Sequence, residues 1–441
     1  MNRLPLRNIT QAAPVSRPRN RLPRRVNGRY ARLRKVTGAC LVAGFFTLPW
    51  WRWNGEQAVW LSLAEGRLNL FGNSFWPEDL NLLAGTLIVA AFALFFVTVI
   101  AGRVWCGYAC PQTVWAAVFT WCERISEGNR TARGHPALRR LAKHVLWLGV
   151  SGWTAVTLVA LFVPSHTLLA GLLGGNLGAP TLAWLGGITL ATYGNAGWLR
   201  EHLCIYLCPY ARFQAVMFDT HTPVVTYRRD RNDCVECTLC VQVCPTGIDI
   251  RDGLQIACIA CGACVEACDG VMARMNLAKG LVAYRGAAPL VRPKGPTLGP
   301  RLPPLRRPRV VGYGLALMAS LAVLAHGLDS RPLVSLSVSK DRLLYRDRGD
   351  GHIENLYSLT LMNKSRQTRD YRLRATGLNE FAWHGAAQLT LAPGEQRTAA
   401  ISLALPYAQA IDQTVSFEVS EVGSSPLPGA RAASRFTGAV Q

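Results

Sequence analysis

The sequence predicts a multi-domain membrane protein: an α-helical transmembrane bundle of about five helices, a Cys-rich domain inserted before the last helix, and a C-terminal all-β immunoglobulin-like sandwich. Three observations support this fold class: long uncharged apolar segments, a run of eight Cys between positions 234 and 268, and alternating strand-like segments after position 329. Half of the 441 residues are hydrophobic and the formal net charge is +22. This composition excludes a disordered protein and is unusual for a soluble enzyme.

The N-terminal segment, residues 1–35, is predicted to lie in the cytoplasm. It holds eleven basic residues and no acidic residue, and Lys and Arg accumulate on the cytoplasmic side of membrane helices. An arm that binds nucleic acid is the alternative explanation for such a charge. The topological explanation is favoured, so we expect contact with membrane lipid and no nucleic acid.

Five segments are predicted to cross the membrane, because about 20 mainly apolar residues form a helix that spans a core of about 30 Å. Four of them form the region 36–199 and the fifth follows the inserted segment: residues 36–51, 82–101, 145–163, 181–198 and 310–328. Gly175 and Pro180 interrupt the uncharged stretch 164–199, which receives one span although its length also admits two. With one span there, the basic segment 200–309 is cytoplasmic and residues 329–441 are periplasmic.

The inserted cytoplasmic segment, residues 200–309, carries the pattern C-x2-C-x2-C-x3-C twice within a core of residues 230–285. This is the spacing of bacterial two-cluster ferredoxins, in which three thiolates of each copy hold one 4Fe-4S cluster and the fourth holds the other. The predicted ligand sets are therefore Cys234, Cys237, Cys240 and Cys268 for one cluster, and Cys258, Cys261, Cys264 and Cys244 for the second. Two structural zinc sites are the alternative use of eight thiolates, but the doubled spacing favours clusters.

A second Cys pattern, C-x-Y-x-C-P, occurs twice at the predicted cytoplasmic ends of spans. It comprises Cys106 and Cys110 in one copy, and Cys204 and Cys208 in the other. On a helix, residues i and i+4 share a face, and Pro at the next position can begin a new helix. Cys110 and Cys208 would then lie at helix N-termini, where the helix dipole lowers the pKa of a thiol. Such thiols suit a soft metal such as Cu(I) or a redox dithiol; packing at helix ends is the alternative.

The two remaining cysteines, Cys40 and Cys122, have no such partner in the sequence and are expected to pack against neighbouring side chains. No Cys follows Cys268. All fourteen cysteines therefore lie on or near the predicted cytoplasmic, reducing side of the membrane.

The C-terminal part, residues 329–441, alternates apolar and polar residues in short segments separated by turn residues. The clearest of these are residues 333–338, 356–361, 371–375, 388–392 and 414–419. Several short strands over about 110 residues are typical of an immunoglobulin-like sandwich. We find no catalytic cluster in this part, so we expect it to bind a partner.

The chain resembles the CcoG/FixG/RdxA family of membrane polyferredoxins, known as cytochrome c oxidase accessory proteins. The resemblance covers nearly the whole chain. Its motifs are VWCGYACPQTVW at 104–115, CIYLCPYARFQ at 204–214, CVQVCPTGIDIR at 240–251 and the Leu-Met-Asn-Lys-Ser pattern at 361–365.

This resemblance implies a multi-pass protein of the bacterial inner membrane that assists the assembly of a cbb3-type oxidase by reducing Cu(II) to Cu(I). It implies an oxidoreductase with cupric reductase activity, two 4Fe-4S clusters held by the eight ferredoxin cysteines, and copper at Cys106, Cys110, Cys204 and Cys208 as a candidate site. The implied partners are oxidase assembly factors, or copper chaperones and transporters, and an electron donor that the sequence does not identify.

Two other functions remain open from the sequence. The first is a quinol-oxidising polyferredoxin that feeds electrons to another respiratory reductase. The second is a non-redox assembly scaffold whose clusters are structural. Redox titration of the clusters separates the scaffold from both electron carriers, because structural clusters would not cycle without unfolding.

Overall fold

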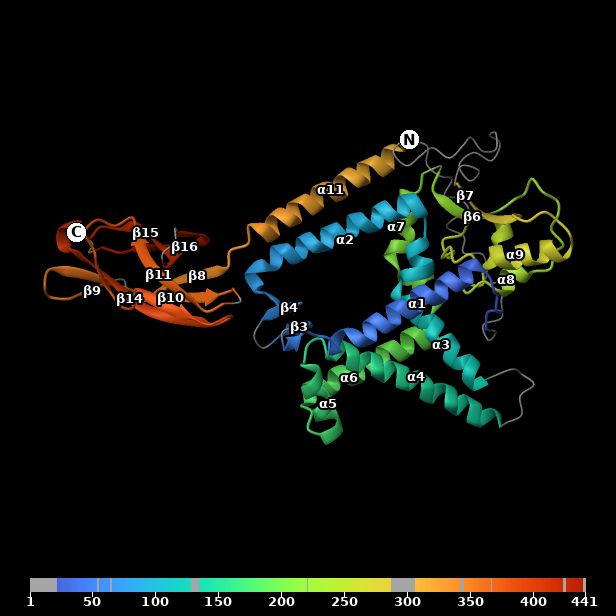
Figure 1. Cartoon of the computed structure of the whole chain (residues 1–441), viewed down its shortest axis with the longest axis horizontal. Helices are drawn as coiled ribbons and strands as arrows, with labels where there is room; N and C mark the ends of the chain where they lie inside the picture. The colour runs from blue at the N-terminus through green and yellow to red at the C-terminus, as the bar shows by residue number, and fades with distance from the viewer. Residues whose placement is uncertain are drawn as a thin grey trace. The chain divides into compact units, whose positions relative to one another are not determined.

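The computed structural model describes residues 22–53, 55–63, 66–127, 135–219, 221–286, 306–341, 345–365, 367–422 and 426–438 (Figure 1). The predicted cytoplasmic arm at 1–21 and the linkers at 128–134 and 287–305 lie outside these residues. The chain divides into two compact units, one of residues 1–72 and 83–322 and the other of residues 73–82 and 323–441.

The first unit holds the membrane helices and the inserted domain. Its helices are α1 (Arg29–Thr47), α2 (Leu80–Ala101), α3 (Pro111–Glu127), α4 (Pro136–Val159), α5 (Ser165–Gly174), α6 (Ala179–Thr192), α7 (Pro209–Met217), α8 (Leu239–Gln242), α9 (Ala263–Arg274) and α11 (Pro308–Asp329), of which α2 and α11 continue into the second unit. Its strands are β1 (Arg52–Trp53), β2 (Glu56–Gln57), β3 (Val59–Ser62), β4 (Arg67–Leu70), β6 (Pro223–Tyr227) and β7 (Val282–Gly286).

Helices occupy all five predicted spans, but not all of them are apolar enough to cross a membrane. Among the described residues, α2 and α11 are each long and apolar enough to cross a membrane. Helix α5 and residues 179–199 reach this length and apolarity only together, as a third span bent by 95°. The first turns of α1 and α4 carry basic residues such as Arg32 and Arg139, which shortens their apolar stretches. Both helices also end earlier than predicted, at Thr47 and Val159. The predicted number of about five spans is therefore not confirmed.

The predicted break within residues 164–199 is present. Helix α5 ends at Gly174, and Gly175 adopts a left-handed conformation with φ of 69°, which glycine adopts without strain. Helix α6 then begins at Ala179, with Pro180 in its first turn. The chain thus turns within a few residues at the glycines that the sequence singles out.

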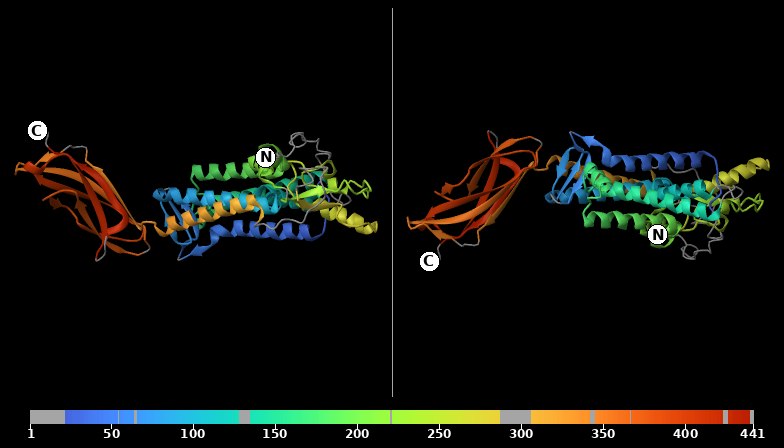
Figure 2. Two further views of the ribbon diagram at one scale, coloured as in Figure 1. Left: turned by 90° about the horizontal axis from the view of Figure 1, so that it is seen from above. Right: turned by 90° about the horizontal axis from the view of Figure 1, so that it is seen from below.

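The helices pack through aromatic and small side chains. Phe119 of α3 lies 5.5 Å from Trp147 of α4, and Tyr193 lies 5.8 Å from the same Trp147. Helices α2 and α11 run side by side in Figures 1 and 2, with Phe95 and Tyr313 6.1 Å apart. These contacts hold the helices whose ends carry the thiol motifs.

The inserted domain is built around one antiparallel strand pair and two short helices. Strand β6 pairs with β7, with Val225 opposite Tyr284. Val225, Ile250, Ala260, Val265 and Val282 form its buried apolar core. Cys240 of the first Cys run lies on α8, and Cys264 and Cys268 of the second run lie on α9.

The second unit is a two-sheet β-sandwich. The strands of the sandwich are β8 (Val334–Lys340), β9 (Arg346–Asp347), β10 (His352–Asn363), β11 (Arg369–Thr376), β12 (Ala382–His384), β13 (Gln388–Leu391), β14 (Gln396–Pro406), β15 (Gln413–Glu421) and β16 (Pro426–Phe436). The short strand β5 (Asn73–Phe75) is also assigned to this unit but belongs to neither sheet of the sandwich. One sheet has the order β12-β14-β10-β8, with β9 paired to β10, and the other has the order β13-β11-β15-β16. All five strands predicted in the sequence are present.

The sandwich core follows the predicted alternation. Every second residue of β10 is buried, including Tyr357 and Leu359, and Tyr357 packs 5.0 Å from Phe417 of the other sheet. The segment just before α2 belongs to this unit, where the buried carboxylate of Asp79 pairs with Arg331 at 2.6 Å and with Lys364 at 3.6 Å.

Candidate cluster and thiol site

The first cavity of the inserted domain is lined by Cys234, Cys237, Cys240 and Cys268, which is the first predicted ligand set. Its other walls are mainly apolar and include Met272 and Leu281. Cys234 and Cys237 come from the loop before α8, Cys240 lies on α8 and Cys268 lies on α9. Cys237 is exposed, so this cavity opens toward the surface of the domain.

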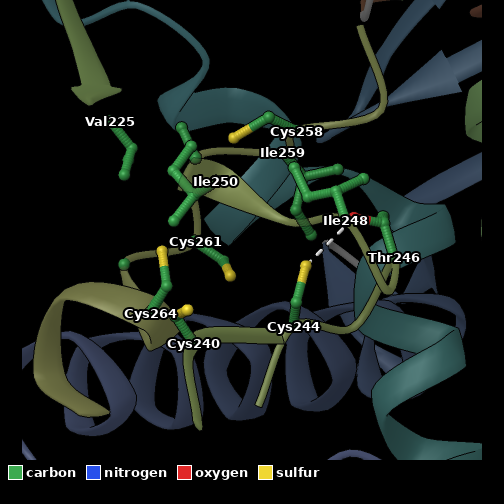
Figure 3. A pocket seen from close by; sticks show the side chains of 12 residues that line it. Val225, Cys240, Cys244, Thr246, Ile248, Ile250, Cys258, Ile259, Cys261 and Cys264 are labelled. Carbon is green, nitrogen blue, oxygen red and sulfur yellow. Dashed lines mark hydrogen bonds between the residues drawn. The ribbon is translucent and has the colours of Figure 1, made fainter. Parts of the chain in front are cut away.

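The second cavity is lined by Cys244, Cys258, Cys261 and Cys264, which is the second predicted set, together with Cys240. Figure 3 shows these five thiols around a common space with Ile248 and Ile250 beside them. The Cys244 thiol also lies 3.3 Å from the Thr246 hydroxyl. Unlike Cys237, Cys258 and Cys261 are buried. Cys240 therefore lines both cavities, which the spacing alone does not reveal.

The two Cys loops have the same backbone geometry. In the first, Glu236 and Thr238 on either side of Cys237 have φ of 47° and 54°; in the second, Ala260 and Gly262 on either side of Cys261 have φ of 51° and 72°. Left-handed residues next to a central Cys turn the chain around a compact object and direct backbone N–H groups inward. This repeat makes both loops suited to wrap a cluster.

The residues of both cavities fit 4Fe-4S clusters. Among the described residues, no three Cys, His, Asp or Glu side chains converge closely enough to hold one metal ion, and the thiols are instead distributed around the cavity walls. Burial raises the pKa of Cys258 to about 12 and that of Cys240 to about 11. Thiols in such apolar surroundings deprotonate when iron binds, because the metal replaces the proton.

The two C-x-Y-x-C-P motifs form matching single turns of π-helix, at Trp105–Ala109 and Leu203–Leu207. The backbone N–H of Cys110 donates to the Trp105 carbonyl, and that of Cys208 donates to the Leu203 carbonyl, both at 2.8 Å. Helices α3 and α7 begin at the prolines that follow. The predicted position of Cys110 and Cys208 at helix N-termini is thus confirmed. The expected α-helical turn is wrong, because the hydrogen bond spans five residues instead of four.

The four thiols of these motifs share one neighbourhood. Burial, followed by the charges of Cys110, Cys106 and Cys208, raises the pKa of Cys204 to about 12. Burial also raises the pKa of Cys106 to about 11 against the opposing effect of Arg103. The Cys106 thiol donates to the Gln214 amide oxygen at 3.5 Å. A protonated thiol is therefore the resting form of Cys106 and Cys204 at neutral pH.

The first motif lies directly against the loop of the second cavity. A Cβ on Gly107 would come within 2.8 Å of the Ile259 carbonyl oxygen and 3.2 Å of the Ala260 carbonyl oxygen. Cys106 packs against the buried group that contains Ile259 and Cys261. Only a glycine at position 107 permits this approach, so the motif and the cavity share one wall.

Several residues of this region are not evident from the sequence. Arg103 is buried and donates to the carbonyl oxygens of Ile256, of Cys258 at 2.7 Å and of Ala211 at 3.0 Å. Glu266 caps the first turn of α1. Arg103 appears in the sequence only as one of many basic residues at the end of a span, and no motif marks it.

The two isolated cysteines, Cys40 and Cys122, differ in burial. Cys122 is buried on α3 and packs with Phe119 and Trp147, as predicted. Cys40 is exposed on α1, so the prediction that it packs is wrong. No sequence pattern predicts that Cys40 is exposed.

Comparison with known families assigns each of these parts. Residues 199–233 and 227–287 match a family described as a 4Fe-4S dicluster domain, and residues 83–127 match a 4Fe-4S binding domain. Residues 324–439 match a family described as an IG-like fold at the C-terminus of FixG. The chain therefore combines iron–sulfur domains with an immunoglobulin-like domain.

Three curated relatives extend this result. Protein RdxA of Cereibacter sphaeroides is 37% identical over 395 residues, covering 82% of this chain and 84% of the relative. The nitrogen fixation protein FixG of Rhizobium meliloti is 34% identical over 430 residues, covering 83% and 81%. The ferredoxin-type protein NapH of Haemophilus influenzae is 28% identical over 206 residues, covering 42% and 65%.

Proposed function

Because the chain belongs to the FixG/RdxA family, we propose that it is a membrane iron–sulfur electron-transfer protein that reduces Cu(II) to Cu(I) for maturation of a cbb3-type cytochrome c oxidase. Copper is the substrate in this reaction. Each Cu(II) ion takes up one electron from the donor, which is a quinol or a cytoplasmic reductant. The iron–sulfur character rests on the two families of 4Fe-4S domains that the chain matches.

In this proposal the eight ferredoxin cysteines hold two clusters in the crossed sets. Cys234, Cys237, Cys240 and Cys268 line the first cavity, and Cys244, Cys258, Cys261 and Cys264 line the second. When bound, 4Fe-4S clusters accept and release single electrons. The apolar walls exclude water, and the exposure of Cys237 favours the first cavity as the side that a donor approaches.

The single observation that carries the proposal is the close packing of Gly107 against Ile259 and Ala260. It brings a pair of soft thiols, Cys106 and Cys110, to the wall of the buried cavity. Soft thiols favour Cu(I) over Cu(II), so they stabilise the product of the reduction. Metal binding also displaces the protons that burial keeps on Cys106 and Cys204.

We further propose that the N-terminus and the inserted domain are cytoplasmic and that the β-sandwich is periplasmic. The basic residues before α1 and at the ends of α2 and α11 support this orientation through the positive-inside rule. The proposed partners are oxidase assembly factors or copper chaperones and transporters. The β-sandwich is the part proposed to dock with such partners.

Anaerobic Cu(II) reduction by the purified protein tests the proposal, with iron and copper measured on the same sample. The double variant Cys106→Ser, Cys110→Ser should lose copper reduction and keep its iron. Cys40→Ser is the matched control, because Cys40 is exposed and distant in sequence from both motifs. An unchanged rate in the double variant would contradict a role of these thiols.

A quinol-oxidising polyferredoxin that feeds another respiratory reductase is the second candidate. The similarity to the ferredoxin-type protein NapH over 206 residues favours it. Cluster reduction by a quinol in the absence of copper, followed by oxidation by a reductase partner, would support this function over copper reduction.

A further inference from the structure

Arg103 is a buried cation without an acidic partner. Its side chain is 4% exposed, and no Asp or Glu forms an ion pair with it in the part of the chain that the structure describes. Its Nε atom is buried and has no hydrogen-bond partner. An arginine remains protonated in a protein, so this position holds a full positive charge.

Three separate segments meet at this guanidinium. Arg103 precedes the first thiol motif by three residues and donates to the carbonyl oxygens of Ile256 and Cys258 in the loop of the second cavity. It also donates to the carbonyl oxygen of Ala211, three residues after Cys208 of the second motif. The thiols of Cys258, Cys106 and Cys208 and the Tyr210 hydroxyl are ionisable groups that act electrostatically on this guanidinium.

A buried cation of this kind requires a negative charge nearby, since carbonyl dipoles alone compensate it only in part. A 4Fe-4S cluster held by four thiolates carries a net negative charge that increases on reduction. Such a cluster in the second cavity would supply the missing counter-charge. Arg251 beside the first cavity differs, because Asp249 pairs with it at 2.6 Å.

We propose that Arg103 is a positioning residue that raises the reduction potential of the cluster in the second cavity and holds both thiol motifs against that cavity. The inference depends on the proposed cluster ligation, and it does not depend on copper reduction. A positive charge stabilises the reduced, more negative cluster, so its removal shifts the potential to more negative values.

Potentiometric titration of the intact protein, followed by electron paramagnetic resonance, tests this role. Arg103→Gln should move one of the two cluster signals to a more negative potential and leave the other unchanged. Arg103→Lys retains the charge but loses the fork of hydrogen bonds, so it should keep the potential near wild type and slow copper reduction. Arg251→Gln is the control for location, and it should not move the signal that Arg103→Gln moves.

Wild-type potentials in an Arg103→Gln protein with full iron content would overturn the proposal. If that variant does not assemble, Gln214→Glu introduces a negative charge beside Cys106 while Arg103 remains. Unchanged potentials in this second variant would equally overturn the proposal. The titration remains informative if the wild-type protein fails to reduce Cu(II), so failure of the copper function is distinguished from failure of this inference.

Discussion

Glu266 of α9 accepts hydrogen bonds from the backbone N–H of Ala31 through both carboxylate oxygens, at 3.2 Å. It also accepts from the N–H of Tyr30, so a side chain of the Cys-rich domain caps the first turn of α1. Gly28 precedes this turn, and a Cβ there would collide with Glu266. The cap therefore attaches the domain to helix α1.

Glu266→Ala should destabilise this attachment by about 1 kcal/mol, because it removes the cap and a negative charge from a helix N-terminus. The midpoint of thermal loss of the visible iron–sulfur absorbance should fall, while the iron content at low temperature is unchanged. Glu127→Gln is the control, since Glu127 forms a partly exposed pair with Lys143. Equal midpoints for the two variants would exclude the capping role.

Single Cys→Ser variants should show whether each cluster is held by cysteines of both sequence repeats, as in the crossed sets, or by the four cysteines of one repeat. Cys237→Ser and Cys268→Ser are expected to alter the same cluster, although the two residues lie on different sequence repeats. Cys244→Ser should alter the cluster that Cys258→Ser alters. Resonance spectra and iron content of each variant provide the measurement. Pairing of Cys268 with Cys258 instead would contradict the crossed assignment.

The two sets of four cysteines were predictable from the sequence because their spacing is local. Each loop repeats the same intervals, and the structure repeats the same left-handed residues around Cys237 and Cys261. Arg103 and Glu266 were not predictable in this way. Their partners, Cys258 and Ala31, lie more than 150 and 230 residues away in sequence, and only the folded chain brings them together.

The ends of the helices in the first unit were also not predictable from the sequence, for a different reason. Apolar composition located α2 and α11, which contain long uncharged runs. Composition could not fix the ends of α1 and α4, since their basic first turns lie inside the helix and not before it. Helix boundaries depend on capping and packing, which a hydropathy pattern does not contain.

Stability should depend on pH through Asp219. Burial alone would raise the pKa of this carboxyl, but hydrogen bonds from Arg307, the His221 N–H and the Thr222 hydroxyl outweigh burial and lower it. The ion pair with the buried Arg307 has a length of 2.7 Å. Because the folded-state pKa lies below the unfolded value of about 3.9, the stabilisation is complete above pH of about 5 and is lost as the pH falls through the folded-state pKa.

Asp219→Asn should therefore reduce stability by about 3 kcal/mol at neutral pH, as Arg307 loses its buried partner. The difference from wild type should decrease toward zero as the pH falls below about 4. Denaturant midpoints measured across this range provide the test. A difference that stays constant with pH would show that the charge of Asp219 is not what stabilises the pair.

The stability of the β-sandwich should depend on the ion pairs of Asp79. This buried carboxylate pairs with Arg331 and Lys364, and the Arg331 guanidinium also lies 4.5 Å from the Phe75 ring. Asp79→Asn leaves two cations with a neutral partner and should destabilise this unit by about 3 kcal/mol. Limited proteolysis of the full chain should then cleave the sandwich faster. Glu418→Gln, which removes a pair whose partner Arg431 is 68% exposed, should leave the cleavage rate unchanged.

The contact between the first thiol motif and the second cavity can be tested at Gly107. Gly107→Ala places a Cβ 2.8 Å from the Ile259 carbonyl, where neither backbone can yield without moving the Cys loop. The proposed copper reduction should slow by an order of magnitude or more, because electron transfer weakens with distance, and both clusters should remain assembled. Gly270→Ala is the matched control: it lies in α9 with no atom within 4 Å of its Cβ. Helix propensity makes that control neutral or more stable by up to about 1 kcal/mol, so a loss of reduction in Gly107→Ala alone would identify the shared wall as the functional contact.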